Sequence, residues 1–136
     1  MKKSQVRPKI MRTGIYGLAQ ENGKTLVVMQ QKGAHKGKFD LPGGGLDHGE
    51  TIEEALRREL LEETGMTFRS MRWIENCTAT TGSLHQVGLI YQIESLTPVA
   101  DRSTELPHFW IESEQLLSSP LAPFLSAVLQ KSTLSK

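Results

Sequence analysis

The sequence predicts an α/β fold in which a mixed β-sheet carries helices on two of its sides. Short runs rich in β-branched and aromatic residues alternate along the chain with turn signals. A helix with clearly marked ends lies in the middle of the chain, and a second apolar helix is predicted near its end. With 136 residues, the chain has the length of one domain, and we expect residues 1–136 to form it.

The strands follow from these runs in chain order. Residues 13–19 and 25–31 are predicted to pair as a hairpin, because Asn22 and Gly23 between them favour a tight turn. Further strands are expected at residues 39–41, 67–76, 85–93 and 108–112. The three glycines that follow the third strand are interpreted as a turn that lets the backbone approach a ligand closely.

The central helix is expected to begin at Ile52. Thr51 and Glu54 form a capping box, in which each side chain satisfies a free backbone N–H group. Gly65 suits the left-handed conformation that ends a helix. The boundaries of this helix therefore follow from local chemistry.

The end of the chain is also expected to be helical. Residues 113–117 are predicted to form a helical turn, and residues 120–131 a closing helix. Ser119 is the predicted cap of this helix, and Pro120 lies near its first position, which proline favours. Its apolar face is formed by Leu121, Leu125, Val128 and Leu129.

Three carboxylates interrupt the apolar stripe of the central helix. At about 100° per residue, this stripe consists of Ile52, Ala55, Leu56 and Leu60. Glu59 and Glu63 fall inside it, and Glu62 lies at its edge. Crowded, half-buried carboxylates repel one another and lose hydration, so they persist where a cation compensates them. Since Arg57 and Arg58 are too few for this task, we expect a divalent metal ion.

The region around this helix resembles the Nudix hydrolase family. The family's Nudix box has the pattern G-x5-E-x7-R-E-U-x-E-E-x-G-U, in which U is a bulky aliphatic residue. The pattern is filled without a gap by Gly44, Glu50, Arg58, Glu59, Leu60, Glu62, Glu63, Gly65 and Met66. The resemblance covers only a small part of the chain, but it has many fixed positions. It implies a Nudix-type α/β/α sandwich and the Mg2+- or Mn2+-dependent hydrolysis of a diphosphate linkage, usually in a nucleoside diphosphate derivative.

The resemblance also implies roles for the carboxylates. Glu59, Glu62 and Glu63 are expected to hold the metal, and Glu63 is the firmest ligand among them. A carbonyl group of the glycine turn, which we assign to Gly43, is expected to assist. Mg2+ suits hard oxygen ligands, and Mn2+ fits the same set. Water then attacks phosphorus, and either Glu59 or Glu62 accepts its proton, because family members differ in the base they use.

Other residues are expected to support this chemistry. Arg58 is included among the catalytic residues because it is expected to pair with Glu50 and orient the neighbouring carboxylates. The residues expected to support the site structurally are Gly44, Glu50 and Gly65. Many family members add an acidic residue from outside the box. Glu105 is our candidate for this metal ligand and Glu112 is a weaker one, while an ordinary solvated acid is the alternative for Glu105.

Substrate recognition is less well defined by the sequence. Lys38 and Phe39 are our candidates for substrate binding. Basic residues before the glycine turn either contact phosphates or form a solvated loop, and these are Lys32, His35, Lys36 and Lys38. Aromatic residues that either stack on a base or pack in the core are Phe39, Trp73 and Trp110. The histidines show no metal-ligand spacing and are expected at the surface or in loops; they are His35, His48, His85 and His108.

Composition restricts the partners of this chain. A net charge of +1 provides no strong signal for nucleic-acid binding. The basic N-terminal residues either touch RNA or form a solubilising tail, and they are Lys2, Lys3, Arg7, Lys9 and Arg12. Cys77 is the lone cysteine, which excludes an internal disulfide and suits the reducing cytoplasm, where we expect the chain. No apolar run approaches membrane-spanning length, no signal peptide is visible, and a homodimer is compatible with the sequence.

A nucleoside triphosphate or a similar small nucleotide is the leading substrate, and three alternative functions remain. A non-catalytic nucleotide sensor with this fold would usually show a damaged box. An RNA 5′-end pyrophosphohydrolase would use the same residues but would need a basic groove. An isomerase acting on a diphosphate would be expected to carry further histidine and cysteine features.

Overall fold

The computed structural model describes residues 9–99 and 104–134, with the side chains of the last helix described as far as residue 131. The strands of the first half are β1 (Ile10–Leu18), β2 (Gln20–Glu21), β3 (Lys24–Met29), β4 (Phe39–Asp40) and β5 (Gly43–Gly45). Those of the second half are β6 (Met66–Thr67), β7 (Ser70–Thr81), β8 (Leu84–Glu94), β9 (Thr97–Pro98) and β10 (His108–Glu112). The helices are α1 (Ile52–Thr64), α2 (Ser113–Leu116) and α3 (Pro123–Leu134).

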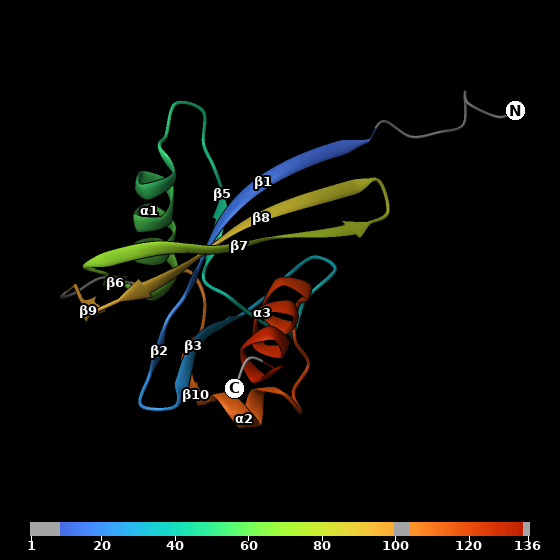
Figure 1. Ribbon diagram of the computed structural model, residues 1–136. Helices are drawn as coiled ribbons and strands as arrows, with labels where there is room; N and C mark the ends of the chain where they lie inside the picture. Colours follow the sequence, from blue (N-terminus) through green and yellow to red (C-terminus); the bar gives the residue numbers. More distant parts are fainter. Residues whose placement is uncertain (1–8, 100–103, 135–136) are drawn as a thin grey trace, which may run out of the picture.

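The main sheet is mixed, and it lies between two helices. Its strand order is β5-β1-β8-β7, with β1 parallel to β8 and the other neighbours antiparallel. Ile15 of β1 packs with α1, whereas Ile90 of β8 packs with α3. Because Ile15 pairs with Leu89, the neighbour of Ile90, the two isoleucines point to opposite faces of the sheet. Figure 1 shows α1 and α3 on the two sides of this sheet, as the sequence predicted.

A smaller sheet closes the other end of the molecule. Its order is β10-β3-β2, and β4 pairs with β3 on the same sheet. The predicted turn at Asn22 and Gly23 is confirmed, since both residues have left-handed φ values of 53° and 78°. However, the hairpin joins β2 to β3, because β1 ends at Leu18 and belongs to the main sheet. The predicted strand over residues 13–19 therefore lies in β1 as far as Leu18, and the strand that pairs with β3 in the hairpin is the separate strand β2.

One other strand prediction needs correction. The predicted strand over residues 67–76 is two strands, β6 and β7, because Phe68 leaves the sheet to bury its ring beside α1. β7 then continues to Thr81 and turns at Gly82 into β8. At the far end of β7, half-buried Cys77 and Ala79 alternate with exposed Thr78 and Thr80, but these small side chains give a weak apolar pattern, and the predicted strand therefore ended too early.

The glycine turn and the closing helix also differ from expectation. The three glycines form strand β5, which pairs with β1, because Tyr16 and Gly43 are partners in the ladder. The last helix begins at Pro123 and not at Pro120. The Phe39 N–H donates to the Pro120 carbonyl at 3.0 Å, and the Ala122 N–H donates to the Phe39 carbonyl at 2.8 Å. This pairing holds the preceding segment extended, so that the second proline takes the first helical position.

Some expectations concern parts of the chain that are not described. Lys2, Lys3 and Arg7 lie outside the described residues. Across residues 9–99 and 104–134, none of the helices has the length and apolar character needed to cross a membrane.

Candidate active site

The helix that carries the carboxylates has the predicted ends. The Glu54 N–H donates to Thr51 Oγ1 at 3.1 Å, and the Thr51 N–H donates to Glu54 Oε1 at 2.9 Å. At the other end Gly65 has a left-handed φ of 72°, and its N–H donates to the Leu61 carbonyl at 2.9 Å. These caps fix which residues of α1 face the sheet.

The carboxylates of α1 interrupt its buried face as predicted. Leu56 and Leu60 are completely buried, and Glu63 is only 8% exposed between the helix and the sheet. The side chain of Glu59 is 14% exposed, whereas that of Glu62 is 31% exposed. Glu63 therefore belongs to the core face, Glu59 borders it, and Glu62 lies at its edge.

Strand β5 packs its glycines directly against these carboxylates. The Gly43 N–H donates to Glu63 Oε1 at 3.0 Å. A Cβ atom added at Gly44 would lie 2.6 Å from Glu59 Oε2, whereas one added at Gly45 would meet nothing within 4 Å. Gly43 has a φ of 147° and leaves no room for a Cβ beside the Ile15 carbonyl. The first two glycines thus let the backbone approach the carboxylates closely.

Arg58 binds several oxygen atoms at once. Its Nε donates to Glu50 Oε2 at 2.6 Å, and its Nη2 donates to Glu50 Oε1 at 2.9 Å. Nη2 also donates to the Gly45 carbonyl at 3.1 Å, while Nη1 donates to Glu59 Oε1 at 2.9 Å. Glu62 accepts longer bonds of 3.4 Å from Nη1. The predicted pair of Arg58 and Glu50 is confirmed, and Arg58 connects β5 to two of the three α1 carboxylates.

The charge of Arg58 does not compensate all of the acidic side chains. Hydrogen bonds from Arg58 and from the Asp47 N–H lower the pKa of Glu50 to about 2, so this residue is fully ionised at neutral pH. Burial raises the pKa of Glu63 to about 8 despite the Gly43 hydrogen bond, and Glu59, Asp40 and Glu105 raise it further. Burial also raises the pKa of Glu59, against the opposing effect of Arg58. Within the described part of the chain, Glu63 therefore lacks a cationic partner, and Arg58 compensates Glu59 only in part.

The carboxylate oxygens of α1 suit a hard divalent cation that keeps several waters of its own. Among the described residues, no three His, Cys, Asp or Glu side chains converge into a preformed metal-binding set. Mg2+ does not require such a set, because it is usually held by one or two carboxylates and keeps several waters. Glu63 is buried and Glu59 is partly buried beside the β5 backbone, and both carry carboxylate oxygens of this kind.

The two acidic residues considered outside this helix lie in different places. Glu105 is exposed, its N–H donates to the Glu62 carbonyl at 2.9 Å, and its charge raises the pKa values of Glu59 and Glu63. Glu112 pairs with Lys24 in the smaller sheet. The structure therefore brings Glu105 to the α1 carboxylates, whereas Glu112 belongs to the hairpin end of the smaller sheet.

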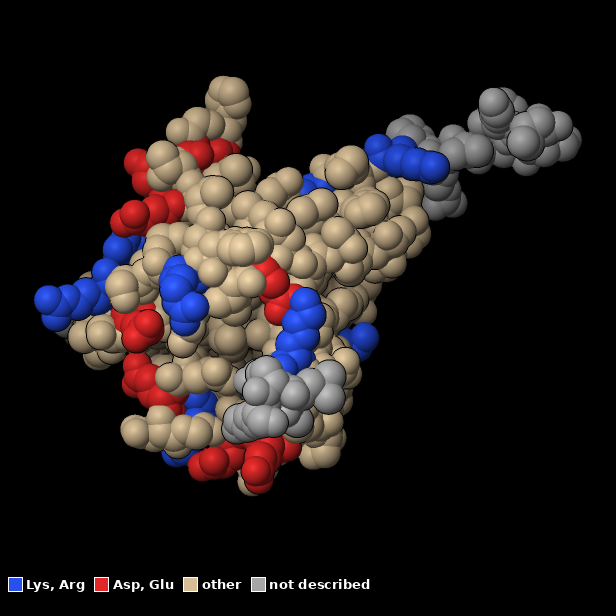
Figure 2. All heavy atoms as spheres, viewed as in Figure 1, with Lys and Arg blue, Asp and Glu red and all other residues tan. Residues whose placement is uncertain are grey.

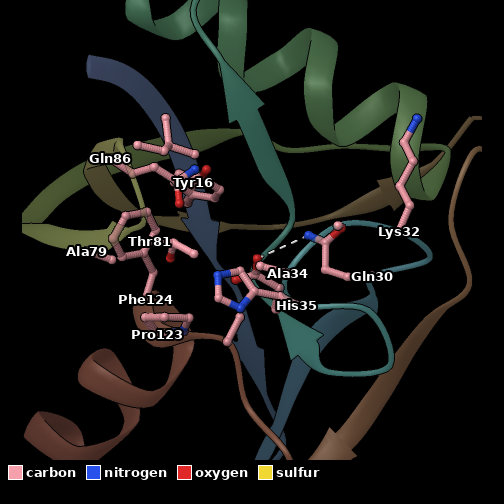
Figure 3. A pocket seen from close by; sticks show the side chains of 14 residues that line it. Tyr16, Gln30, Lys32, Ala34, His35, Ala79, Thr81, Gln86, Pro123 and Phe124 are labelled. Carbon is pink, nitrogen blue, oxygen red and sulfur yellow. Dashed lines mark hydrogen bonds between the residues drawn. The ribbon is translucent and has the colours of Figure 1, made fainter. Parts of the chain in front are cut away.

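A cavity of about 280 Å³ lies on the α3 side of the main sheet. Its walls come from β1, β7, β8, the loop after β3, and the start of α3, as Figure 3 shows; they include Tyr16, Gln30, His35, Asp40, Gln86 and Phe124. Tyr16 and Phe124 meet edge to face with ring centroids 5.2 Å apart. Burial raises the pKa of Tyr16, and the charges of Asp40, Glu63 and Glu59 raise it further. Tyr16 lines the cavity and pairs in the ladder with Gly43, whose N–H donates to Glu63.

Asp40 is a feature of the site that the sequence patterns did not reveal. It is 8% exposed, and its carboxylate accepts hydrogen bonds from Gln30 Nε2 at 3.1 Å and from the Leu41 N–H at 2.8 Å. Burial raises its pKa to about 6, although both hydrogen bonds oppose this change. A carboxylate between Phe39 and Leu41 in a strand expected to be buried was the available signal.

Only some of the residues predicted to bind substrate line this cavity. Phe39 and Lys38 do not line it; the Phe39 ring packs edge to face on Phe109, with centroids 6.2 Å apart. Lys32 and His35 do line it, although the Lys32 side chain points away from the others in Figure 3. Among the tryptophans, Trp110 packs against the core, whereas Trp73 is 53% exposed on β7.

The face of the molecule shown in Figure 2 carries both signs of charge. Lys and Arg side chains are interspersed there with Asp and Glu side chains. The ion pairs of the molecule include that of Lys131 and Glu75, whose Nζ and Oε2 atoms are 2.8 Å apart. A surface of this kind does not produce a field of one sign over this face.

Known proteins share the sequence and the fold. Residues 8–131 match the family model of the NUDIX domain. The nucleoside triphosphatase NudI of Escherichia coli is 31% identical over 121 residues, which cover 78% of this chain and 85% of NudI. The oxidized purine nucleoside triphosphate hydrolase of Danio rerio is 44% identical over 59 residues, or 43% of this chain, and the match spans only 38% of that protein. A MutT NUDIX hydrolase from Burkholderia pseudomallei has a TM-score of 0.79 at 21% identity, covering 90% of this chain and 98% of that one.

Proposed function

The chain belongs to the NUDIX hydrolase family, and from this premise we propose that it cleaves a phosphoanhydride bond in a nucleoside triphosphate or a similar small nucleotide. The reaction requires a divalent cation, Mg2+ or Mn2+, held on α1. The main observation behind this proposal is that Glu59 and Glu63 pack against the glycines of β5, where positive charge does not fully balance their negative charge. The name of the Escherichia coli relative, a nucleoside triphosphatase, supports the choice of substrate class.

The cation would be held by Glu59, Glu62 and Glu63, with the Gly43 carbonyl and Glu105 as further oxygen donors. When bound, it neutralises charge on the phosphates, which these carboxylates would otherwise repel. Glu63 is fixed by the Gly43 N–H, and Glu105 is tied to α1 through its backbone. These attachments leave the carboxylate oxygens with free lone pairs for a ligand.

The proton of the attacking water is taken by Glu59 or by Glu62. Burial raises the pKa of Glu59, which brings this group closer to the range where a general base works efficiently at neutral pH. Glu62 is more exposed and receives only long hydrogen bonds from Arg58, so its carboxylate is free to contact solvent water. Arg58 positions both groups through its fixed bonds to Glu50 and to the Gly45 carbonyl.

The nucleobase is proposed to enter the cavity on the α3 side of the sheet. The volume of about 280 Å³ is close to the lower end of small-molecule sites, which is roughly 300 Å³. Tyr16 and Phe124 offer aromatic surface, while Gln30 and Asp40 offer polar atoms for the edge of a ring. Tyr16 also pairs with Gly43, whose N–H binds Glu63, so a base in the cavity would place its phosphates toward α1. Lys38 and Phe39 do not line the cavity but directly precede Asp40, and they remain candidates for contacts with the phosphates or the sugar.

A small nucleotide is favoured over an RNA end. The chain has a net charge of +1, and acidic and basic side chains are interspersed on the face in Figure 2. A reducing compartment such as the cytoplasm suits Cys77, which is half-buried and whose pKa is raised to about 11 by burial and by Glu75.

A substrate panel tests this proposal. Purified protein is incubated with nucleoside triphosphates, nucleoside diphosphate conjugates and a 5′-triphosphorylated RNA, each with Mg2+ and with Mn2+, and the products are separated by ion-exchange chromatography. We expect cleavage of nucleoside triphosphates to exceed that of the other two classes. Preferred cleavage of the RNA would favour the alternative end-processing function. Binding of nucleotides without cleavage of any compound would favour a sensor.

A further inference from the structure

His35 contains a buried nitrogen that has no partner in the protein. Among the described side chains, which are those of residues 9–99 and 104–131, its Nδ1 is the buried nitrogen or oxygen that lacks a hydrogen bond. Buried polar atoms are almost always paired, because leaving one unpaired forfeits its hydration without replacement. Two other polar side chains of the same cavity wall, Gln30 and Asp40, form a hydrogen bond with each other. In the free protein the Nδ1 atom is shielded from solvent, so a molecule in the cavity can bind it only after the imidazole turns about its Cβ–Cγ bond, a turn that no hydrogen bond between the ring and the described residues opposes.

The position of His35 is set by the backbone of its loop and not by a partner of its ring. The Gln30 N–H donates to the Lys38 carbonyl at 3.0 Å, and the Gly37 N–H donates to the Gln30 carbonyl at 2.8 Å. The Lys38 N–H donates to the His35 carbonyl at 3.0 Å. Gly33 and Gly37 have φ values of 82° and 80°, which close this compact loop. The loop thus presents His35 to the cavity before any ligand is bound.

The surroundings of His35 are those of a site for a planar ring with a polar edge. In Figure 3 its imidazole lies at the centre of the cavity, between Gln30 and the side chains that project from the main sheet. The edge-to-face pair of Tyr16 and Phe124 supplies aromatic surface in the same cavity. An imidazole nitrogen can donate or accept, depending on the tautomer, so it can pair with either kind of ring atom.

We propose that His35 binds the nucleobase in the cavity through a hydrogen bond between its Nδ1 and a polar atom on the edge of the base. This inference rests on the proposed function, since it assumes a nucleotide whose base occupies the cavity. His35 lies on the loop between β3 and β4, outside α1 and β5, so its contribution concerns the binding of the base and not the chemistry at phosphorus.

Three substitutions at one position test the role of Nδ1. His35→Phe keeps a planar ring but removes both nitrogens. His35→Asn places a polar atom near the position of Nδ1, whereas His35→Gln places one near Nε2. For the preferred nucleoside triphosphate, we expect His35→Phe and His35→Gln to raise KM about five- to tenfold with little change in kcat, which corresponds to one neutral hydrogen bond. His35→Asn is expected to restore most of the loss.

Two controls separate base recognition from a general effect on the fold. His85 is exposed on β8 and does not line the cavity, so His85→Phe is the matched substitution and is expected to leave KM unchanged. Ribose 5′-triphosphate has no base to contact His35, so wild type and His35→Phe should cleave it with the same KM. Calorimetric binding of the nucleoside monophosphate in chelator provides a second measurement, and we expect its affinity to fall by the same factor in His35→Phe.

The outcomes distinguish this inference from the function on which it rests. If wild type cleaves nucleotides but His35→Phe and His35→Gln keep the wild-type KM for every base, the role of His35 is wrong and the proposed function stands. The role of His35 is also wrong if the loss is equal for ribose 5′-triphosphate. If wild type neither cleaves nor binds any nucleotide, both proposals fail. If thermal unfolding shows that His35→Phe does not fold, His35→Gln tests the same expected rise in KM.

Discussion

The backbone N–H of Gly43 donates a hydrogen bond of 3.0 Å to the carboxylate of Glu63, which lies 20 residues further along the chain. This contact joins strand β5 to helix α1. It also leaves Glu63 as a buried acid with one backbone donor, and burial raises its pKa to about 8. The glycine strand and the acidic helix are therefore parts of one site, and this site stores an electrostatic cost that a cation would relieve.

The first prediction concerns the pH dependence of stability in the metal-free protein. The pKa of Glu63 rises from an ordinary value of 4.5 to about 8 on folding. Between these values the folded state keeps a proton that the unfolded state releases, so stability falls as the pH rises through this window. Glu63→Gln keeps an oxygen for the Gly43 N–H but cannot ionise. We therefore expect the stability of this variant to decrease less than that of wild type as the pH rises. Above pH 8, the variant should be more stable than wild type.

Thermal unfolding in chelator, recorded from about pH 5 to about pH 9, measures this difference. A residual slope is expected in the variant, since burial also raises the pKa values of Glu59 and Asp40. Addition of Mg2+ should raise the Tm of wild type more than that of Glu63→Gln, because the variant lacks a ligand. Parallel pH profiles for the two proteins would show that Glu63 is not the buried acid described above.

The second prediction uses the glycines of β5. An alanine at Gly44 would place its Cβ 2.6 Å from Glu59 Oε2, at the flexible end of that side chain. We expect Gly44→Ala to fold but to displace the Glu59 carboxylate, and to lower kcat by about 100-fold, the scale of a displacement near 1 Å. Gly45→Ala is the matched control, since its Cβ would meet nothing within 4 Å. Equal kcat values for both variants would contradict a role for the position of Glu59.

The third prediction concerns the shape of the Arg58 side chain. Arg58→Lys keeps the positive charge but cannot reproduce the planar fork that reaches Glu50, Glu59 and the Gly45 carbonyl together. We expect a loss of about 10- to 100-fold in turnover or in Mg2+ affinity, as is typical of groups that orient metal ligands. Arg57→Lys is the control, because Arg57 pairs with Glu53 and with the Phe68 carbonyl on another side of α1. Unchanged Mg2+ affinity and turnover in Arg58→Lys would assign this residue to a solvated surface.

The fourth prediction separates the general base from the metal ligands. A positioned base contributes roughly 10²–10⁴-fold to the rate. We expect one of the variants Glu59→Gln and Glu62→Gln to lose turnover on this scale at saturating Mg2+, with little change in substrate affinity. The other should recover at least partly as Mg2+ is raised, because mass action restores a weakened equilibrium but not a missing proton acceptor. If both recover near-normal turnover in high Mg2+, neither is the base, and Glu105 is the next residue to replace.

Helix α1 could be predicted almost completely because its determinants are local. The capping box at Thr51, the left-handed Gly65 and the stripe that places Glu63 in the core all depend on residues within one helix. The pairing of Arg58 with Glu50 followed from the resemblance to the Nudix box and is also close in sequence. Local chemistry and a fixed helical period were sufficient for these features.

Features that depend on distant partners could not be predicted in the same way. The glycines of β5 form a strand only because β1 lies beside them, and nothing in their own composition indicates this. Phe39 pairs with residues 120–122, which delays the start of α3 to Pro123. The cavity with Asp40 combines β1, β4, β7, β8 and α3, so its walls are defined only by the tertiary fold. Substrate recognition is likewise a feature that depends on residues distant in sequence.

The dependence of nucleotide hydrolysis on free Mg2+ tests the central claim most directly. The rate of product release from the preferred nucleoside triphosphate is measured by ion-exchange chromatography while free Mg2+ is set with a chelator. We expect the rate to rise with Mg2+ to saturation and to extrapolate to zero without it, with Glu63→Gln requiring a higher concentration. Full hydrolysis in excess chelator would contradict the assignment of α1 and β5 as a metal-dependent catalytic site.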